Sequence, residues 1–192
     1  MTEREMMDFL HKAENLKNNT RHSVTSTGRP ESVAEHSWRV SLMAMLLEDE
    51  IQGADFDKII RMCILHDLGE AITGDIPSFL KTKEDAQHED DMLFQWVDTL
   101  PNPQRGRFKA LFEEMLALET AEARIYKSLD KLEAVIQHNE APIDSWLPLE
   151  YELNQTYGVK EAQAAGTKME ALRMLAVLDT KRKIAEEGIS EN

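Results

Sequence analysis

The sequence predicts an all-α fold, and three observations lead to that prediction. Apolar residues recur at helical spacing in almost every segment of the 192-residue chain. No segment alternates convincingly between polar and apolar residues, as a half-exposed strand would. Apolar residues make up 42% and charged residues 30% of the chain, which is typical of a globular protein with a sizeable core. We expect residues 1–192 to form a single domain.

The N-terminal part predicts a helix, a loop and a second helix. Residues 3–17 repeat apolar side chains at helical spacing, whereas residues 18–30 (NNTRHSVTSTGRP) contain enough breakers to predict a loop. Ser32 and Glu35 then form an S-x-x-E capping box, which marks the start of a helix. The apolar run that follows carries this helix onward until Gly53.

A third helix is predicted to lie buried in the centre of the domain. Asp57 is a suitable N-cap for it, and residues 59–65 are apolar on nearly all sides. The rest of the chain predicts a turn at 73–79, helices at about 84–100, 107–117 and 121–138, a proline-broken loop at 139–151, and a long last helix at about 160–187.

The charge balance argues against nucleic-acid polymers as partners. Acidic residues outnumber basic residues 36 to 22, which gives a formal net charge of -14. Such a surface repels the phosphate backbone of a duplex. A small phosphorylated molecule is still compatible, because a bound metal and a few local cations can outweigh a distant field.

Two further features bear on the compartment. No apolar run approaches the roughly 18 residues that a membrane span needs, and no signal-peptide pattern is present, so we expect no membrane partner. The chain has a single cysteine, Cys63, which rules out an internal disulfide and fits a reducing compartment. We therefore expect a cytoplasmic protein.

The adjacent pair His66-Asp67 is the first candidate for chemistry. Both residues lie near the end of the predicted buried helix, where an imidazole and a carboxylate are costly unless they are paired or bound to a cation. Glu70 follows four residues after His66 and three after Asp67, which brings its carboxylate towards the same face. A lone buried histidine is more often a core residue than a ligand. Three ionisable groups at one helix end instead favour a cation between them.

His36 and Asp130 are candidates from two other helices. His36 lies one turn inside the Ser32-capped helix and aligns with its core-facing apolar residues. Asp130 lies in an apolar-patterned helix, where its position alone fits a solvent-facing residue equally well. Together with His66 and Asp67 they would form a mixed nitrogen and oxygen set, which suits manganese, cobalt, iron or zinc better than magnesium or calcium.

Three blocks of the sequence carry a family resemblance. PESVAEHSWRVSLMA (residues 30–44), HDLGEAITGDIPSF (66–79) and EARIYKSLDKLEAVIQ (122–137) resemble the HD-domain phosphohydrolases. Within that superfamily they are most similar to the bacterial 5′-deoxynucleotidases and the eukaryotic HD-domain-containing protein 2 family. The resemblance is strongest over residues 21–137 and fades beyond them. It implies a single helical HD domain on which the C-terminal helix packs, and a homodimer.

The resemblance also implies roles for individual residues. His36, His66, Asp67 and Asp130 match the family's metal ligands, and Glu70 matches an acid that handles the attacking water. Asp67, Asp75 and Ser78 match residues near the nucleotide and the water, and Arg21 matches an arginine that orients the phosphate. In some relatives the residues that match Glu70, Asp75 and the Ile76 carbonyl hold a second cation.

One position departs from the family pattern. The family usually has a tryptophan beside or near the phosphate-orienting arginine, where it acts on the sugar and base. Here His22 follows Arg21, which puts the preference for deoxyribose in doubt. His22 could stack on a base or bond a hydroxyl, or it could be an ordinary loop histidine. The metal ligands are untouched by this change.

Several other polar residues have an ordinary interpretation. Lys81 is a further candidate cation, but exposed lysines are common, and we expect it to be one of them. We expect His11, His88 and His138 to be surface residues, because the sequence places no ligand-like partners near them.

These observations favour a metal-dependent enzyme that releases phosphate from nucleoside or deoxynucleoside 5′-monophosphates. A divalent transition metal and a small nucleotide are the implied cofactor and substrate. One alternative is a phosphodiesterase or another nucleotide phosphohydrolase on the same site. A second alternative is a non-catalytic, nucleotide-binding regulatory HD module with a structural metal.

Overall fold

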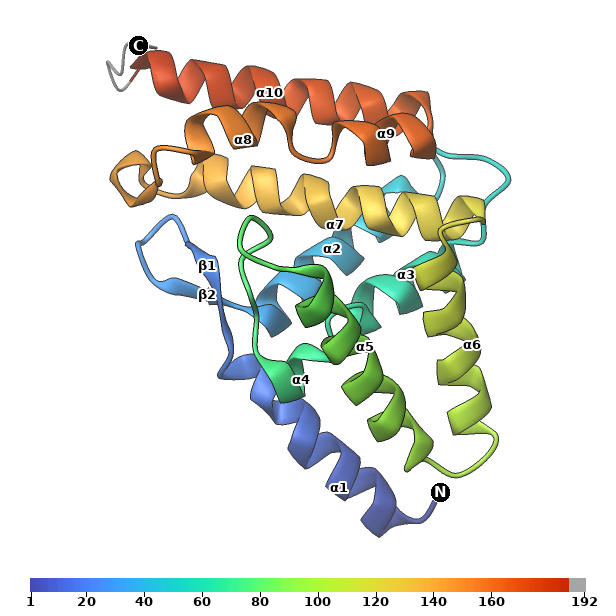
Figure 1. Ribbon diagram of the computed structural model, residues 1–192. Coiled ribbons are helices and arrows are strands. Elements are labelled where there is room, and N and C mark those ends of the chain that lie inside the picture. Colours follow the sequence, from blue (N-terminus) through green and yellow to red (C-terminus); the bar gives the residue numbers. More distant parts are fainter. Residues whose placement is uncertain (187–192) are drawn as a thin grey trace.

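Helix α7 is the element around which the rest of the protein is arranged (Figure 1). The structure, a computed structural model, describes residues 1–186. Helix α7 (Ala121–Glu140) contacts α2 (Val33–Leu47) and α3 (Phe56–Leu65) on one side, and α9 (Val159–Ala165) and α10 (Thr167–Glu186) on the other. Its Ile125, Leu129, Leu132 and Val135 are almost completely buried, which explains why this helix occupies the centre.

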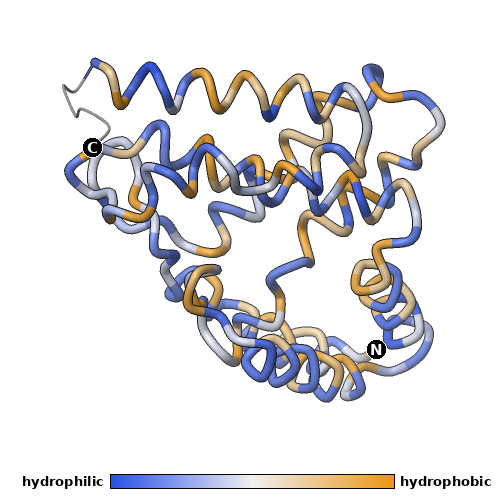
Figure 2. The backbone as a smooth tube through the Cα atoms, turned by 45° about the horizontal axis from the view of Figure 1, so that its top comes forward, coloured by the Kyte–Doolittle hydropathy of each residue, from blue (hydrophilic) through white to orange (hydrophobic). Residues whose placement is uncertain are grey.

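The remaining elements surround these helices. At the end of the molecule away from α10 lie α1 (Glu3–Ala13), α4 (Glu70–Thr73), α5 (Lys83–Asp98) and α6 (Gln104–Ala117). Helix α8 (Glu150–Thr156) precedes α9, and short 3-10 turns span Glu14–Lys17 and Ile143–Ser145. Hydrophilic and hydrophobic residues are interspersed along α10 (Figure 2), and Met169, Arg173, Ala176, Thr180 and Ile184, spaced three or four residues apart, form its buried face. Among residues 1–186, no helix combines the length and the apolar character that crossing a membrane requires.

The helical prediction is confirmed, but the segment predicted as a loop at 18–30 contains part of a small hairpin. Strands β1 (Thr20–Val24) and β2 (Pro30–Ser32) pair antiparallel, with Thr20 opposite Ser32 and Val24 opposite Pro30. Gly28, with φ of +79°, makes the turn between them. The pattern concealed the strands because Arg21, His22 and Ser23 form an almost wholly polar strand without apolar alternation.

Several predicted boundaries are also corrected. The third helix is capped by Asp55 rather than Asp57, since the Asp55 side chain accepts from the Lys58 N–H. Helix α2 ends at Leu47 rather than near Gly53. The predicted loop at 139–151 contains a 3-10 turn and the start of α8. The predicted last helix is divided into α9 and α10 at Gly166, whose φ is +106°, and its expected end at 187 lies outside the described residues.

The capping box at the start of α2 is confirmed. The Ser32 hydroxyl accepts from the Glu35 N–H at 3.2 Å, and the Glu35 carboxylate accepts from the Ser32 N–H at 2.9 Å. This cap sets the start of α2 and hence the position of His36, which is fully buried one turn later.

We expect Ser32→Ala to lower the free energy of unfolding by about 1 kcal/mol, because it removes one half of the capping box. Thr2→Ala is the matched control: Thr2 forms the same box at α1, a helix with no buried residue. Thr2→Ala should therefore lower the free energy of unfolding, measured by chemical denaturation, by less than Ser32→Ala does. Equal decreases in the free energy of unfolding for both variants would contradict the idea that the α2 cap supports a helix packed on the core.

Candidate metal centre

Two histidines and two aspartates from separate elements meet beneath a cavity. His36 comes from α2, His66 and Asp67 follow the end of α3, and Asp130 comes from α7. His36 Nε2 lies 3.2 Å from His66 Nε2 and 3.2 Å from Asp130 Oδ1. Asp67 Oδ2 lies 3.2 Å from His66 Nε2 and 3.8 Å from His36 Nε2. The structure thus brings together all four residues that were expected to bind a metal.

Contacts behind the two imidazoles fix their orientation. His66 Nδ1 lies 2.8 Å from the Cys63 carbonyl oxygen, to which it donates, so His66 Nε2 faces the cluster. His36 Nδ1 contacts the carboxylate of Glu133, which directs His36 Nε2 to the same point. A hydrogen-bonded partner behind each imidazole is the usual arrangement for a metal-binding histidine.

The donor set fits a divalent metal ion. Ligands around a tetrahedral metal with bonds of about 2.1 Å lie about 3.4 Å from one another. The separations in this cluster, 3.2 to 3.8 Å, bracket that value. Asp67 Oδ2 is buried without a hydrogen-bond partner. Burial lowers the pKa of His66, but the carboxylates of Asp67 and Asp130 outweigh burial and raise it to about 10. The cluster therefore attracts positive charge.

Glu133 is a site residue that the sequence reasoning did not single out. It is fully buried, and besides His36 it binds Arg39, whose Nε lies 2.6 Å from Glu133 Oε1. Arg39 also donates to Gln137 at 2.7 Å and to Glu140 at 2.5 Å.

Glu31, His36 and Glu133 form a second close group of donors, but both oxygens of Glu133 already contact His36 and Arg39. The sequence contained one indication that Glu133 belongs to the site: it lies three residues after Asp130 and therefore on the same face of the helix.

Arg21 projects from β1 to the edge of the cluster. Its Nη1 lies 3.6 Å from Asp67 Oδ2, and its Nε lies 3.4 Å from Glu31 Oε2. Burial lowers the pKa of Arg21, but Asp67 and other carboxylates outweigh it and raise the pKa above its usual range. The guanidinium therefore stays charged at the cavity wall, as expected for a phosphate-orienting residue.

Glu70 and Asp75 border the cavity beside Asp67. Glu70 is buried, and its Oε2 has no hydrogen-bond partner. Burial, followed by the carboxylates of Asp67 and Asp75, raises the pKa of Glu70 to about 10. Burial also raises the pKa of Asp75, although Arg21 opposes the shift. The Asn19 amide donates to the Glu70 carbonyl at 2.5 Å and holds α4 against the hairpin.

Two lysines add positive charge to the cavity wall. Lys127, which the sequence reasoning did not single out, donates from Nζ to Asp130 Oδ2 at 2.8 Å. Lys81 is half-buried and pairs with Glu89 at 2.5 Å, so the expectation that it is an ordinary exposed lysine is wrong. Both lysines line the same cavity as Arg21 and Glu70. An anion entering this cavity meets local cations in spite of the acidic surface.

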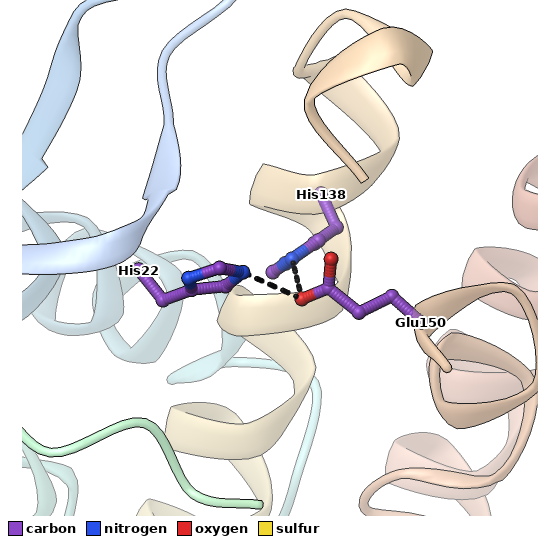
Figure 3. Close-up of side chains that lie close together, drawn as sticks. All are labelled: His22, His138 and Glu150. Carbon is purple, nitrogen blue, oxygen red and sulfur yellow. Dashed lines mark hydrogen bonds and ion pairs between the residues drawn. The ribbon is translucent and has the colours of Figure 1, made fainter. Parts of the chain in front are cut away.

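The cavity extends from the cluster to a second group of polar side chains at its other end. His22, His138 and Glu150 gather there from β1, α7 and α8 (Figure 3). His138 Nε2 lies 2.8 Å from Glu150 Oε1, so the expectation that His138 is a surface residue without partners is wrong. Ser78 and Ile76 also line the cavity. The lining also includes Phe79, Ala134, Leu153, Asn154 and Tyr157.

The sequence has known relatives. It matches the HD domain over residues 13–173. It is 31% identical over 141 residues to a human protein named 5′-deoxynucleotidase HDDC2, covering 71% of this chain and 68% of the human protein. A Xenopus laevis protein of the same name is 35% identical over 111 residues, covering 57% of this chain and 54% of that protein.

Solved structures resemble this fold. A protein from Magnetospirillum magnetotacticum, described as a predicted metal-dependent phosphohydrolase, has a TM-score of 0.80 and 25% identity, covering 94% of this chain and 95% of that chain. The PH0347 protein from Pyrococcus horikoshii, at 22% identity and a TM-score of 0.67, shares the fold and covers 93% of this chain and 99% of its own. The match over residues 13–173, together with the helical arrangement, shows that this chain belongs to the HD-domain family.

Proposed function

We propose that this protein is a metal-dependent phosphohydrolase that releases phosphate from nucleoside or deoxynucleoside 5′-monophosphates. The observation that carries the proposal is the convergence of His36, His66, Asp67 and Asp130, with the Arg21 guanidinium next to Asp67. Arg21, Asp67 and Asp130 line one cavity. The names of the human and frog relatives, both 5′-deoxynucleotidases, support the same activity.

His36, His66, Asp67 and Asp130 are the proposed metal ligands. Their donor set suits manganese, cobalt, iron or zinc. When bound, such an ion lowers the pKa of a water molecule towards ~7 and neutralises charge on the phosphoryl oxygens. Glu70, Asp75 and Ile76 also line the cavity, which supports a second cation near them.

The remaining polar residues of the cavity have different proposed roles in hydrolysis. Arg21 holds the phosphate through the two-pronged contact that guanidinium makes with phosphate oxygens. Glu70 is the proposed acceptor of a proton from the attacking water, because it lines the cavity and its buried Oε2 has no hydrogen-bond partner. Asp75, whose pKa is also raised, organises that water or donates a proton to the departing 5′-oxygen. Asp67 and Ser78 border the space for the rest of the nucleotide.

The sugar and base are proposed to lie towards His22. Its ring packs edge-on against Phe79, with ring centroids 5.4 Å apart, and both residues line the cavity. A half-exposed imidazole in that place offers a nitrogen to a sugar hydroxyl, which tryptophan's apolar ring face does not. This difference is consistent with a less strict preference for deoxyribose.

We also propose a cytoplasmic, single-domain homodimer. The one cysteine, Cys63, is buried, which fits a reducing compartment. A contiguous apolar groove across α2, α7 and α10 supports the dimer: Leu46 and Leu175 both line it, and they are 71% and 54% exposed. Exposed apolar patches of this kind commonly mark protein interfaces.

The activity is tested by metal-dependent release of phosphate from a panel of nucleotides. We expect release from 5′-monophosphates and not from triphosphates or cyclic nucleotides. Asp130→Ala should abolish release and reduce the metal content, because it removes a ligand atom that lies close to both imidazoles. Asp8→Ala, on the exposed face of α1, is the control and should leave both unchanged. A chain loaded with manganese or cobalt that hydrolyses no nucleotide would refute the proposal.

Glu133→Gln should weaken metal affinity by about 10- to 100-fold, because it alters the group that orients His36 without removing a ligand. The affinity is measured by titrating metal into the stripped protein, with circular dichroism as the check on folding. Glu140→Gln is the matched control, since Glu140 also binds Arg39 but does not touch His36. If both variants bound metal like the unaltered chain, the positioning role of Glu133 would be wrong.

We expect the unaltered chain to sediment as a dimer and Leu46→Glu to sediment as a monomer, because a charge in the apolar groove opposes its burial. Leu116→Glu is the control: Leu116 is an exposed leucine of α6, 53% exposed, that lies outside the groove. Analytical ultracentrifugation distinguishes the cases. A monomeric unaltered chain would refute the dimer, and a dimeric Leu46→Glu would refute this face.

A further inference from the structure

A second group of metal-type donors lies at the end of the cavity away from His36 and His66. His22, His138 and Glu150 point their side chains towards one another (Figure 3), and their donor atoms lie within 4.8 Å of one another. His22 Nε2 lies 3.2 Å and His138 Nε2 lies 2.8 Å from the same oxygen, Glu150 Oε1. None of these three residues belongs to the first cluster.

Neighbouring backbone groups fix the orientation of His138 and Glu150. His138 Nδ1 lies 3.1 Å from the Ala134 carbonyl oxygen, to which it donates, so a neutral His138 presents the lone pair of Nε2 to Glu150. The other carboxylate oxygen, Glu150 Oε2, accepts from the Leu147 N–H at 2.6 Å. Two electron-rich atoms therefore face each other at 2.8 Å, and they require a proton or a metal ion between them.

The surroundings of Glu150 provide no permanent positive charge. Glu150 is 1% exposed, and a carboxylate buried this deeply needs a cation. Within residues 1–186, its ion-pair partners are His22 and His138, with no lysine or arginine among them. The basic residues of the same cavity are paired elsewhere: Arg21 with Asp67, Lys81 with Glu89, and Lys127 with Asp130.

We propose that His22, His138 and Glu150 bind a divalent transition-metal ion, of the zinc or cobalt class, at a site separate from the first cluster. Two imidazole nitrogens and one carboxylate oxygen form a known three-ligand set for zinc, which leaves a fourth position for water or another ligand. The two measured nitrogen-to-oxygen separations, 2.8 and 3.2 Å, need to widen only slightly to reach the tetrahedral spacing of about 3.4 Å. All three residues line the cavity.

An ion at this site would join three separate parts of the chain. His22 belongs to the hairpin, His138 to the last turn of α7, and Glu150 to the first turn of α8. Since the ligands are dispersed when the chain unfolds, bound metal would stabilise the folded form. The proposal requires no nucleotide and no phosphatase activity, so it can fail or succeed independently of the proposed function.

The experiment measures bound metal in the chelator-stripped protein after it is reloaded with zinc, by mass spectrometry of the metal per chain. We expect His22→Ala and Glu150→Gln each to bind one ion fewer than the unaltered chain. Asp130→Ala should also bind one fewer, and His22→Ala combined with Asp130→Ala should bind two fewer. His88→Ala, an exposed histidine of α5, is the control and should bind the full number.

Two further readouts separate loss of the site from loss of the fold. Visible absorption of bound cobalt should retain the His22-dependent component in Asp130→Ala and lose it in His22→Ala. Zinc should raise the melting temperature of Asp130→Ala more than that of His22→Ala combined with Asp130→Ala. His22 is only partly buried, so its replacement leaves the core intact. A full complement of metal in both His22→Ala and Glu150→Gln would overturn the proposal, and so would a metal-free Asp130→Ala.

Discussion

The carboxylate of Glu133 joins the two helices on which the centre depends. One of its oxygens contacts His36 of α2, and the other binds Arg39 one turn further along the same helix. Because Glu133 belongs to α7, this pair of contacts sets both the position of α2 along α7 and the direction of the His36 ring. A fully buried charge tolerates little displacement of its partners, since any loosened contact leaves it uncompensated. The same spacing between α2 and α7 also determines how His36 lies relative to His66 and Asp130.

An acidic protein that handles an anionic substrate must concentrate its positive charge locally. Arg21, Lys81 and Lys127 line one cavity, while the chain as a whole carries a formal charge of -14. Each of these cations is paired with a carboxylate, Arg21 with Asp67, Lys81 with Glu89 and Lys127 with Asp130, so none adds an unpaired charge to the interior. An entering phosphate can share or exchange these partners at short range, where the field of distant surface acids is screened. The net charge of the surface therefore determines which large partners are repelled. The charges of the cavity wall determine which small molecules can bind there.

Much of the fold and the centre could be predicted because the relevant signals are local. A capping box placed His36, an apolar helix ending in two polar residues marked His66 and Asp67, and helical periodicity located α7. Lys81, Lys127 and His138 were different, because their roles come from partners brought close only by the fold. Glu133 shows the same limit: a glutamate on a helix is usually solvated, and only the approach of α2 makes this one buried. The hairpin was not predicted because Arg21, His22 and Ser23 are polar and line the cavity, so β1 lacks the apolar alternation of a strand that packs on a core.

The hairpin also has a consequence for how this sequence can vary. Neighbouring residues of a regular strand point to opposite faces, yet Arg21, His22 and Ser23 all line the cavity. The pairing of β1 with β2 is irregular between Thr20 and Val24, which lets consecutive side chains reach the same side. A deletion that made β1 regular would turn one of these side chains away, although every chemical group was kept. Natural length changes should therefore accumulate in the turn around Gly28 and be rare within β1.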